Sequence, residues 1–479
     1  MFHIILNVLI CLPIICGADY TNRINPHKNW GEWEGWGTSL AWWANVLGDR
    51  DDVADLMFTT KLIQYNNQSV PGLGLNIIRY NVGGCSANSI GADHMIASPK
   101  IPKFKQIEGF WLNWDSDDPQ SKSWDWSVDK KQRLMVQKAQ DRGVDQIELF
   151  SNSPMWWMLY DHNPSGAPNG GENLQTWNYQ KFAVYLATVA KYAVDHWNVT
   201  FRSVEAFNEA SSMSWTSEGN QEGCHIGSEA QQKVIMYLRD ELNKRGLNET
   251  LVSASDEVTV DSAIKMWESF PQSVRATVGR VNVHGYGYFY GKRDKLYDLV
   301  RKDNKPIWTS EYGEGDGTGL PMAQNLNLDL FWMHTTAWVY WQTFDSSQGW
   351  GMIHADLEKG STGVVAAKYY VMAQYSRHIR KGMLIVESDR SDSVAAYDQS
   401  NRRLVIVTLN IGDDSQNITY DLSQFGRITD GSVSRWTTTP DDKQHYVFDN
   451  KLNVKAKTLN AVLNKKSIHT IVIENVFIQ

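Results

Sequence analysis

Two glutamates, each at the end of an apolar run, are the residues of this chain best suited to do chemistry. Residues 204–209 read Val-Glu-Ala-Phe-Asn-Glu, and residues 306–313 read Pro-Ile-Trp-Thr-Ser-Glu-Tyr-Gly. Either glutamate alone is weak evidence, because most glutamates are solvated surface groups. Two carboxyl groups that flank one glycosidic bond are, however, sufficient to hydrolyse it. We therefore predict that Glu209 and Glu311 face one sugar ring from the ends of two strands.

Such a pair divides the chemistry between two protonation states. One carboxyl group must be protonated to donate to the leaving oxygen, and the other must be ionised to attack the anomeric carbon. A partly desolvated site beside a second negative charge favours the protonated form of the first group. A distance of about 5–5.5 Å between the two carboxyl groups would predict retention of configuration.

Strand-like and helix-like segments alternate after residue 30, and they are the elements that must position the pair. The predicted strands are residues 36–40, 75–81, 146–152, 203–209, 251–257, 280–286, 306–312 and 337–344. Helical spacing of apolar residues is clear in 131–142 and 234–242, each followed by a glycine that can end a helix. This alternation predicts an α/β fold, a closed parallel (β/α)8 TIM barrel.

The pattern changes near Met383, where short strands separated by Asn, Asp, Gly and Ser replace the alternation. We predict an antiparallel β-sandwich over residues 383–479, associated with a catalytic barrel over residues 31–382. Residues 19–30 form an N-terminal segment that can add a strand to the sandwich. No flexible linker separates the two parts, so we expect them to pack rigidly.

Polar and aromatic residues gather at the predicted strand ends, the face on which barrel enzymes carry their active sites. The candidates are Arg79, Trp156, Asn208, Asp256, Glu257, His284, Tyr286 and Trp341. Asn208 is suited to bind a sugar 2-hydroxyl, and Arg79 and Tyr286 to hold the nucleophile ionised and oriented. Trp156 and Trp341 are suited to stack on sugar faces, although one of Trp156 and Trp157 is expected in the core. Asp256 and Glu257 have a plainer interpretation as caps of the following helix.

Other functions fit the sequence poorly. The net charge is −8 with a pI near 5.9, and no Lys/Arg stripe suggests a nucleic-acid partner. No His-Glu-x-x-His, paired Cys-x-x-Cys or Gly-x-Ser-x-Gly motif is present. The sequence therefore shows no motif typical of a metalloprotease, a zinc site or a serine hydrolase.

The N-terminus and the cysteines indicate the secretory pathway. Residues 1–18 resemble a signal peptide; a lipid anchor at Cys16 is the competing interpretation, disfavoured by the bulky residues before it. No later apolar run reaches the ~20 residues of a membrane span. We expect a secreted protein, free of the membrane after cleavage, with a disulfide between Cys85 and Cys224. Sequons that permit N-glycosylation occur at Asn67, Asn198, Asn248 and Asn417.

A set of ordered motifs resembles glycoside hydrolase family 30, and within it most closely the endo-β-1,6-galactanases. The motifs are residues 33–43 (Trp-Glu-Gly-Trp-Gly-Thr-Ser-Leu-Ala-Trp-Trp), 150–158 (Phe-Ser-Asn-Ser-Pro-Met-Trp-Trp-Met), 205–209, 283–286 (Val-His-Gly-Tyr), 310–313 and 338–342 (Trp-Val-Tyr-Trp-Gln). The resemblance covers nearly the whole mature chain. It implies the barrel, the side β-sandwich and a retaining mechanism.

The same resemblance implies residue roles. Glu209 would be the acid/base and Glu311 the nucleophile. The −1 subsite would be lined by Arg79, Trp156, Asn208, Tyr286 and Trp341, with His284 as a further substrate-binding residue. The implied substrate is β-1,6-linked galactan, such as the side chains of arabinogalactan proteins, and no metal or organic cofactor is implied. We expect the protein to be a monomer.

The chain departs from the family pattern at one position, and two alternative functions remain open. The family usually has proline after the acid/base glutamate, where this chain has Ala210, which should loosen the backbone slightly without abolishing activity. The chain could instead act on β-1,6-glucan, xylan or a glycolipid, or be a carbohydrate-binding protein without catalysis. Retention of both glutamates argues against the non-catalytic interpretation.

Overall fold

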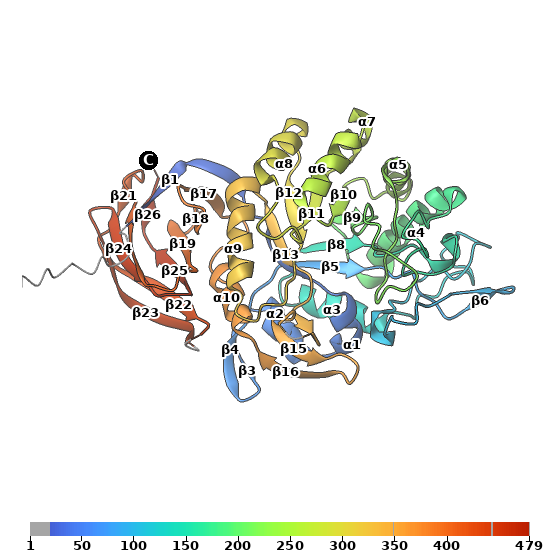
Figure 1. Cartoon of the computed structure of the whole chain (residues 1–479), viewed down its shortest axis with the longest axis horizontal. Coiled ribbons are helices and arrows are strands. Elements are labelled where there is room, and N and C mark those ends of the chain that lie inside the picture. The colour runs from blue at the N-terminus through green and yellow to red at the C-terminus, as the bar shows by residue number, and fades with distance from the viewer. Residues whose placement is uncertain (1–19, 348, 442–443, 479) are drawn as a thin grey trace, which may run out of the picture.

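Eight parallel strands close into a barrel in the computed structural model of the protein, confirming the predicted fold (Figure 1). The structure describes residues 20–347, 349–441 and 444–478, so the predicted signal peptide lies outside the described residues. The strands follow the chain order around the barrel. They are β2 (Gly35–Ser39), β5 (Ile77–Asn81), β8 (Gln146–Phe150), β9 (Ser203–Glu205), β10 (Leu251–Glu257), β11 (Arg280–His284), β12 (Ile307–Glu311) and β13 (Ala337–Tyr340).

Helices surround the barrel and cover the outer face of its sheet (Figure 1). They are α1 (Ala41–Leu47), α2 (Asp51–Phe58), α3 (Lys130–Gln140), α4 (Tyr179–Tyr192), α5 (Ser228–Lys244), α6 (Val260–Ser269), α7 (Gln272–Thr277), α8 (Arg293–Val300), α9 (Leu320–Leu328) and α10 (Ala367–Ser376). Because both faces of the sheet are covered, β5, β8, β11 and β12 are buried at every position. Gly143 and Gly246 follow α3 and α5 with φ of 97° and 74°, the left-handed conformation predicted for their C-terminal glycines.

Several barrel strands end earlier than the sequence predicted. β9 stops at Glu205, and Glu209 lies beyond it with φ of 49°. β11 stops at His284, before Tyr286. The residues after these strand ends turn into the mouth of the barrel and no longer pair with a neighbouring strand. The apolar pattern of the sequence does not show where that turn begins.

The side domain is a sheet of nine strands whose hydrogen bonding runs all the way round. Its strands are β1 (Tyr20–Glu32), β17 (Leu384–Ser388), β18 (Ser393–Asp398), β19 (Arg403–Asn410), β20 (Gln416–Asp421), β22 (Gly431–Thr439), β23 (Gln444–Lys455), β24 (Thr458–Leu463) and β25 (Ser467–Ile473). All pairs are antiparallel except β1 with β20, which is parallel. The N-terminal strand therefore completes a domain built mostly from the other end of the chain, and Ile24 lies in its core.

Two helices lie between the barrel and the side domain (Figure 1). Helix α10 contacts β22, β23 and β25, and α9 contacts β19. The buried side chain of Gln374 on α10 donates a hydrogen bond to Thr438 Oγ1 (2.8 Å) and accepts one from Thr470 Oγ1 (2.6 Å). The two parts thus share a packed, hydrogen-bonded interface.

Short strands outside the two closed sheets were not predicted. They are β3 (Leu62–Tyr65), β4 (Gln68–Pro71), β6 (Ser89–Ile90), β7 (Asp93–His94), β14 (Phe344–Asp345), β15 (Ile353–Asp356), β16 (Ser361–Val365), β21 (Arg427–Ile428) and β26 (Val476–Phe477). They are two to five residues long, too short for a clear alternation of apolar and polar positions. The β14–β16 sheet matters for the site, because β15 and the turn that follows it form one wall of the cavity described below.

Candidate active site

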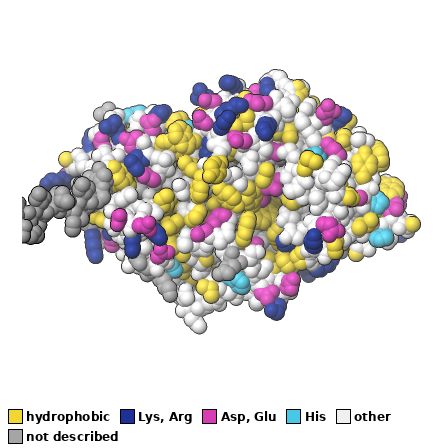
Figure 2. Space-filling model, viewed as in Figure 1, with side chains coloured by type: hydrophobic (Ala, Val, Ile, Leu, Met, Phe, Trp, Pro, Cys, Tyr) yellow, Lys and Arg dark blue, Asp and Glu magenta, His cyan; other side chains and the backbone are white. Residues whose placement is uncertain are grey.

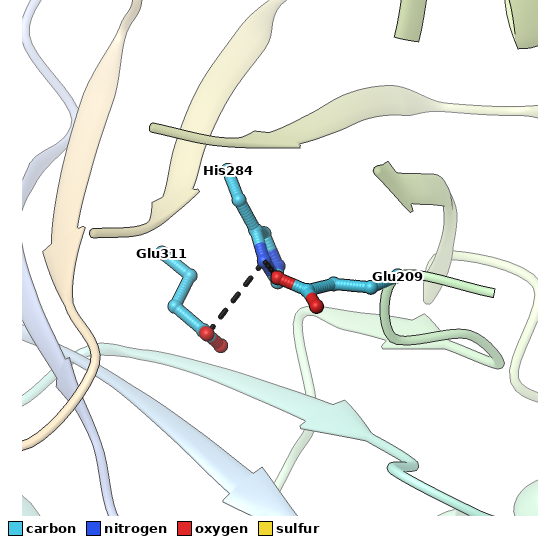
Figure 3. A group of neighbouring side chains, drawn as sticks. All are labelled: Glu209, His284 and Glu311. Carbon is cyan, nitrogen blue, oxygen red and sulfur yellow. Dashed lines mark hydrogen bonds and ion pairs between the residues drawn. The ribbon is translucent and has the colours of Figure 1, made fainter. Parts of the chain in front are cut away.

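The two predicted carboxylates face each other across the mouth of the barrel (Figure 3). Glu311 is the last residue of β12, and Glu209 follows β9. The backbone N–H of Glu209 donates to the carbonyl of Asp256 (2.8 Å), which fixes the turn that brings its side chain inward. Glu209, Glu311 and His284 each place one polar atom within 4.8 Å of the others.

His284, the last residue of β11, lies between the carboxylates (Figure 3). Its Nδ1 is 3.0 Å from Glu209 Oε1 and 3.6 Å from Glu311 Oε1, and its Nε2 is 3.1 Å from Asp256 Oδ2. Burial by itself lowers the pKa of His284, but the charges of Glu311 and Asp256 outweigh it and hold the pKa well above its usual range. The imidazole is therefore positively charged at neutral pH.

Arg79 and Tyr286 hold the carboxylate of Glu311 from two sides. Arg79 Nη1 donates to Oε2 (2.9 Å), and the Tyr286 hydroxyl donates to Oε1 (2.8 Å). Burial raises the pKa of Glu311, and the positive charges of His284 and Arg79 oppose that rise. Burial and the charge of Glu311 raise the pKa of Tyr286 well above its usual range, so its phenol stays a neutral donor.

A layer of paired charges supports these groups from below. Arg79 is fully buried and also bonds Glu148 (3.1 Å) and Asp256. Burial favours the neutral form of Asp256, but Arg79 and His284 lower its pKa to about 2. Asp256 therefore stays ionised and anchors both cations. The predicted alternative, a helix cap, is wrong for Asp256, since Thr259 caps α6 through a reciprocal pair of bonds with Ser262.

A cavity of about 1060 Å³ opens above the pair. Its walls combine polar groups with six aromatic side chains, the composition of a site that binds the polar edges and apolar faces of sugars. The aromatic residues are Trp42, Phe104, Trp215, Tyr286, Trp341 and Trp350.

The structure places most of the predicted binding residues at this cavity. Asn208, Tyr286 and Trp341 line it with both glutamates, while Arg79 and His284 lie directly behind Glu311. Trp341 packs edge-on against Trp42, with ring centroids 5.1 Å apart.

The prediction that Trp156 stacks on a sugar is wrong in this structure. Trp156 is fully buried, does not line the cavity, and donates its indole N–H to Ser86 Oγ (2.7 Å). Trp157 is also buried and donates to the carbonyl of Trp111 (2.7 Å). Both rings belong to the core beneath the loops, because the chain after β8 turns inward there.

Sequence reasoning missed several aromatic residues that line the cavity. Trp215 lines the cavity and donates its indole N–H to the carbonyl of Glu209 (3.0 Å), so it also braces the loop that carries that glutamate. Trp42, Phe104 and Trp350 come from three other segments. Trp42 lies on α1, shortly after the end of β2, so its position carried a signal that sequence reasoning could have used, whereas Phe104 and Trp350 follow no barrel strand directly.

The predicted disulfide is absent, because Cys85 and Cys224 are both free thiols. The Sγ of Cys85 contacts Glu222 Oε1 at 3.3 Å, whereas the Sγ of Cys224 contacts the carbonyl of His225 at 3.7 Å. Each sulfur thus has its own polar neighbour. The four sequon asparagines, Asn67, Asn198, Asn248 and Asn417, are all exposed.

The described residues contain one group with the geometry of a metal site, and it is the Glu209–His284–Glu311 cluster itself. A histidine that binds a metal ion must be neutral, so that one ring nitrogen is unprotonated. The raised pKa of His284 opposes that state, so the cluster suits proton chemistry better than metal binding. None of the helices in the described ranges has the length and apolar character that crossing a bilayer requires.

Comparisons with known proteins identify the family of the chain. The model of O-glycosyl hydrolase family 30 matches residues 19–263. The chain is 47% identical to the endo-β-1,6-galactanase of Hypocrea rufa over 466 residues, which is 96% of each chain.

Solved structures show the same fold at low sequence identity. A conserved exported protein from Bacteroides fragilis superposes with a TM-score of 0.77 at 17% identity, covering 95% of this chain and 100% of that one. The catalytic domain of the GH30 xylanase C from Talaromyces cellulolyticus gives a TM-score of 0.71 at 17% identity, with 95% and 100% coverage.

Proposed function

Because the chain belongs to glycoside hydrolase family 30 and is a glycoside hydrolase, we propose that it cleaves β-1,6-galactosidic linkages within galactan chains, with retention of configuration. Glu209 is the general acid/base and Glu311 the nucleophile in this proposal. The substrate follows from the Hypocrea rufa relative, whose name specifies this linkage and whose similarity extends over 96% of both chains. The side chains of arabinogalactans are the corresponding natural polysaccharide.

The observation that carries the chemistry is the close approach of the two carboxylates. One oxygen of each lies within 4.8 Å of the other, around His284. Retaining enzymes place the two groups about 5–5.5 Å apart, whereas inverting enzymes leave about 6.5–9.5 Å for a water molecule. The separation supports direct attack by Glu311 rather than attack by water.

In the first step, Glu311 attacks the anomeric carbon while Glu209 gives its proton to the departing oxygen. The bond to the leaving sugar breaks as the ester bond to Glu311 forms. Arg79 and Tyr286 each donate to a different oxygen of Glu311, so they fix its orientation before attack. Asn208 lines the cavity, and its Oδ1 has no hydrogen-bond partner within the described part of the chain, which suits a contact with the sugar hydroxyl next to the reacting carbon.

In the second step, Glu209 takes a proton from water, and the resulting hydroxide-like oxygen attacks the anomeric carbon and releases Glu311. Formation of the ester has removed the negative charge of Glu311. Glu209 is then the only one of the two glutamates that can pair with the positive charge of His284. His284 Nδ1 stays within hydrogen-bond distance of Glu209 Oε1 (3.0 Å) and can hold that carboxylate in position for this step.

We also propose that the protein is secreted and glycosylated. The apolar N-terminal segment, the four exposed sequons and the similarity to an exported protein support this location.

The test is to incubate the purified protein with de-arabinosylated β-1,6-galactan beside a Glu311→Gln variant and a Glu229→Gln control. Glu229 is an exposed glutamate on α5, so its variant should match the wild type. Glu311→Gln keeps the shape of the nucleophile without its charge and should lose at least about 10³-fold in kcat. A ladder of galacto-oligosaccharides from the first time points supports endo action.

Other product patterns would separate the parts of the proposal. Release of one small sugar from the start would make the enzyme exo-acting and leave the mechanism in place. Release from β-1,6-glucan or xylan but not from galactan would refute the substrate. Binding of galactan without hydrolysis of any glycan would refute catalysis.

A further inference from the structure

A second hollow lies where the barrel adjoins the side domain, and it shares no lining residue with the catalytic cavity. Its volume is about 250 Å³. One wall is the π-helical turn η6 (Asp329–Met333) after α9, and the other is formed by β1, β17 and β18. On the face drawn in Figure 2, hydrophobic side chains gather at this junction. We call it the Trp332 hollow.

Aromatic rings dominate the Trp332 hollow. Trp332 is 48% exposed although tryptophan is usually well buried, and Phe331 supports it edge-on with ring centroids 4.8 Å apart. Trp30 lies across the hollow, stacked on His334 at 3.7 Å with 21° between the ring planes. These contacts hold the rings in place, so they offer preformed flat surfaces to a ligand.

The rim of the hollow is polar but electrically balanced. Lys28 Nζ lies 2.5 Å from Glu387 Oε1, and the second oxygen of that carboxylate accepts from Asn25 (3.0 Å). Burial lowers the pKa of His334 to about 4, so its imidazole is neutral at working pH. A hollow with paired charges and flat aromatic walls suits a neutral ligand that carries many hydroxyl groups.

We propose that the Trp332 hollow is a second binding site for a segment of the galactan chain, distinct from the catalytic cavity. The proposal rests on the function proposed above. In a β-galactose ring the axial hydroxyl at carbon 4 leaves the opposite face with a patch of C–H groups. That patch matches an exposed indole, while the ring hydroxyls reach the Lys28–Glu387 pair.

The position of the hollow determines what it can bind. Trp332 precedes β13, so it lies at the end of the barrel where the strands begin. Glu209 and Glu311 lie where the strands end. A short oligosaccharide therefore occupies one site or the other, and only a polymer can use both. Holding a chain at the Trp332 hollow raises the local concentration of the remaining linkages near the carboxylates.

The experiment compares Trp332→Ala with Trp177→Ala, which removes a 65% exposed tryptophan that lines neither cavity. For Trp332→Ala we expect KM on polymeric galactan to rise about 5-fold, the loss of one aromatic contact. Its kcat/KM on a galactotetraose should stay at the wild-type value. Retardation in gels containing galactan should fall in the same variant, and Trp332→Tyr should restore most of it.

Each other result overturns the inference in a distinct way. If Trp332→Ala equals Trp177→Ala on the polymer, the hollow does not bind galactan, although hydrolysis by the wild type still supports the proposed function. If the wild type neither hydrolyses galactan nor is retarded by it, both proposals fail. If sedimentation shows a wild-type dimer that Trp332→Ala dissociates, the hollow is a contact between two copies of the chain. As a control, the melting temperatures of both variants should equal that of the wild type, which would show that loss of folding does not cause a difference in KM or in retardation.

Discussion

Glu209 is placed by its backbone as much as by its side chain. Its φ of 49° is uncommon for a residue other than glycine, and its N–H and C=O are both engaged, by Asp256 and Trp215. Strained conformations of this kind persist where the surroundings determine them, often at functional sites. Ala210 stands where the family usually has proline. The two contacts of Glu209 fix the backbone here without that proline.

Removing the side chain of Glu209 tests its role as acid/base. Glu209→Ala should lower kcat on galactan by about 10²–10⁴-fold, since the leaving sugar then departs without a proton. The loss should be much smaller on an aryl galactoside whose phenol leaves without protonation. Azide should restore turnover and yield a β-galactosyl azide, detected by mass spectrometry and NMR. Equal losses on both substrates, with no azide product, would contradict the assignment.

His284 sets the lower pH limit of activity in this arrangement. Glu311 must be ionised to attack, burial raises its pKa, and the charge of His284 opposes that rise. His284→Gln removes the charge, so the pKa of Glu311 should rise further. The pH below which kcat/KM falls should then move upward relative to the wild type.

Tyr286→Phe is the matched comparison for that experiment. It removes the donor to Glu311 Oε1 without changing any charge at neutral pH. We expect it to lower kcat by about 10²–10³-fold, the usual effect of losing one preorganised donor. Its acid limb should shift less than that of His284→Gln, and a larger shift would refute the electrostatic account. The measurement is kcat/KM from pH 3.5 to 8.

At the scale of elements, a buried carboxyl ties two active-site loops together. Glu222, in the loop after β9, accepts from Asn81 Nδ2 (3.3 Å) at the end of β5. It also accepts from the Gly84 N–H (3.0 Å) and the Cys85 thiol (3.3 Å) in the segment that follows β5. Burial raises its pKa to about 7, from about 4.3 in an unfolded chain. Glu222 is therefore protonated in the folded protein where the unfolded chain would already be ionised.

This difference makes stability depend on pH in a known direction. The folded state binds more protons than the unfolded state between those two values, so stability is lost as the pH rises through about 7. Glu222→Gln should flatten the fall of the melting temperature between pH 5 and 8. Glu229→Gln should keep the wild-type dependence. Parallel curves for wild type and Glu222→Gln would show that Glu222 does not contribute.

The helices and strands could be predicted from the sequence where their burial requires a regular pattern of apolar residues. All eight barrel strands and the antiparallel side domain were predicted, because covered strands read as apolar runs and turns read as Asn, Asp and Gly. The paired glutamates followed from their places at strand ends. Trp215 and Trp350 could not be predicted, since a loop places its side chains through tertiary contacts. Trp42, on α1, was not singled out although it closely follows β2.

Two predictions failed for a similar reason. Trp156 follows a strand, as a binding residue would, but the loop turns its ring into the core. Cys85 and Cys224 both follow barrel strands, yet Glu222 occupies the neighbourhood of one thiol. The position of a residue after a barrel strand predicts the face of the barrel on which it lies. The packing of the loop determines which side chains it contacts there.

At the scale of the whole molecule, α10 joins the barrel to the side domain through a buried amide. Gln374 donates to Thr438 and accepts from Thr470, and all three side chains are fully buried. Strand β1 closes the side domain against β17 and β20, so the side domain is incomplete without a strand from the N-terminal part of the chain. We therefore expect the barrel and the side domain to unfold in one transition.

Replacing that amide tests the coupling. Gln374→Leu keeps the approximate volume but removes the side-chain hydrogen bonds to Thr438 and Thr470, at a cost of about 0.5–1.5 kcal/mol for each lost bond. The melting temperature should fall by several degrees in calorimetry, whereas Gln137→Leu, on the exposed side of α3, should change it little. If coupling depends on this contact, the variant should also show a broader or divided transition. A single sharp transition at the wild-type temperature would mean that apolar packing of α10 alone holds the two parts together.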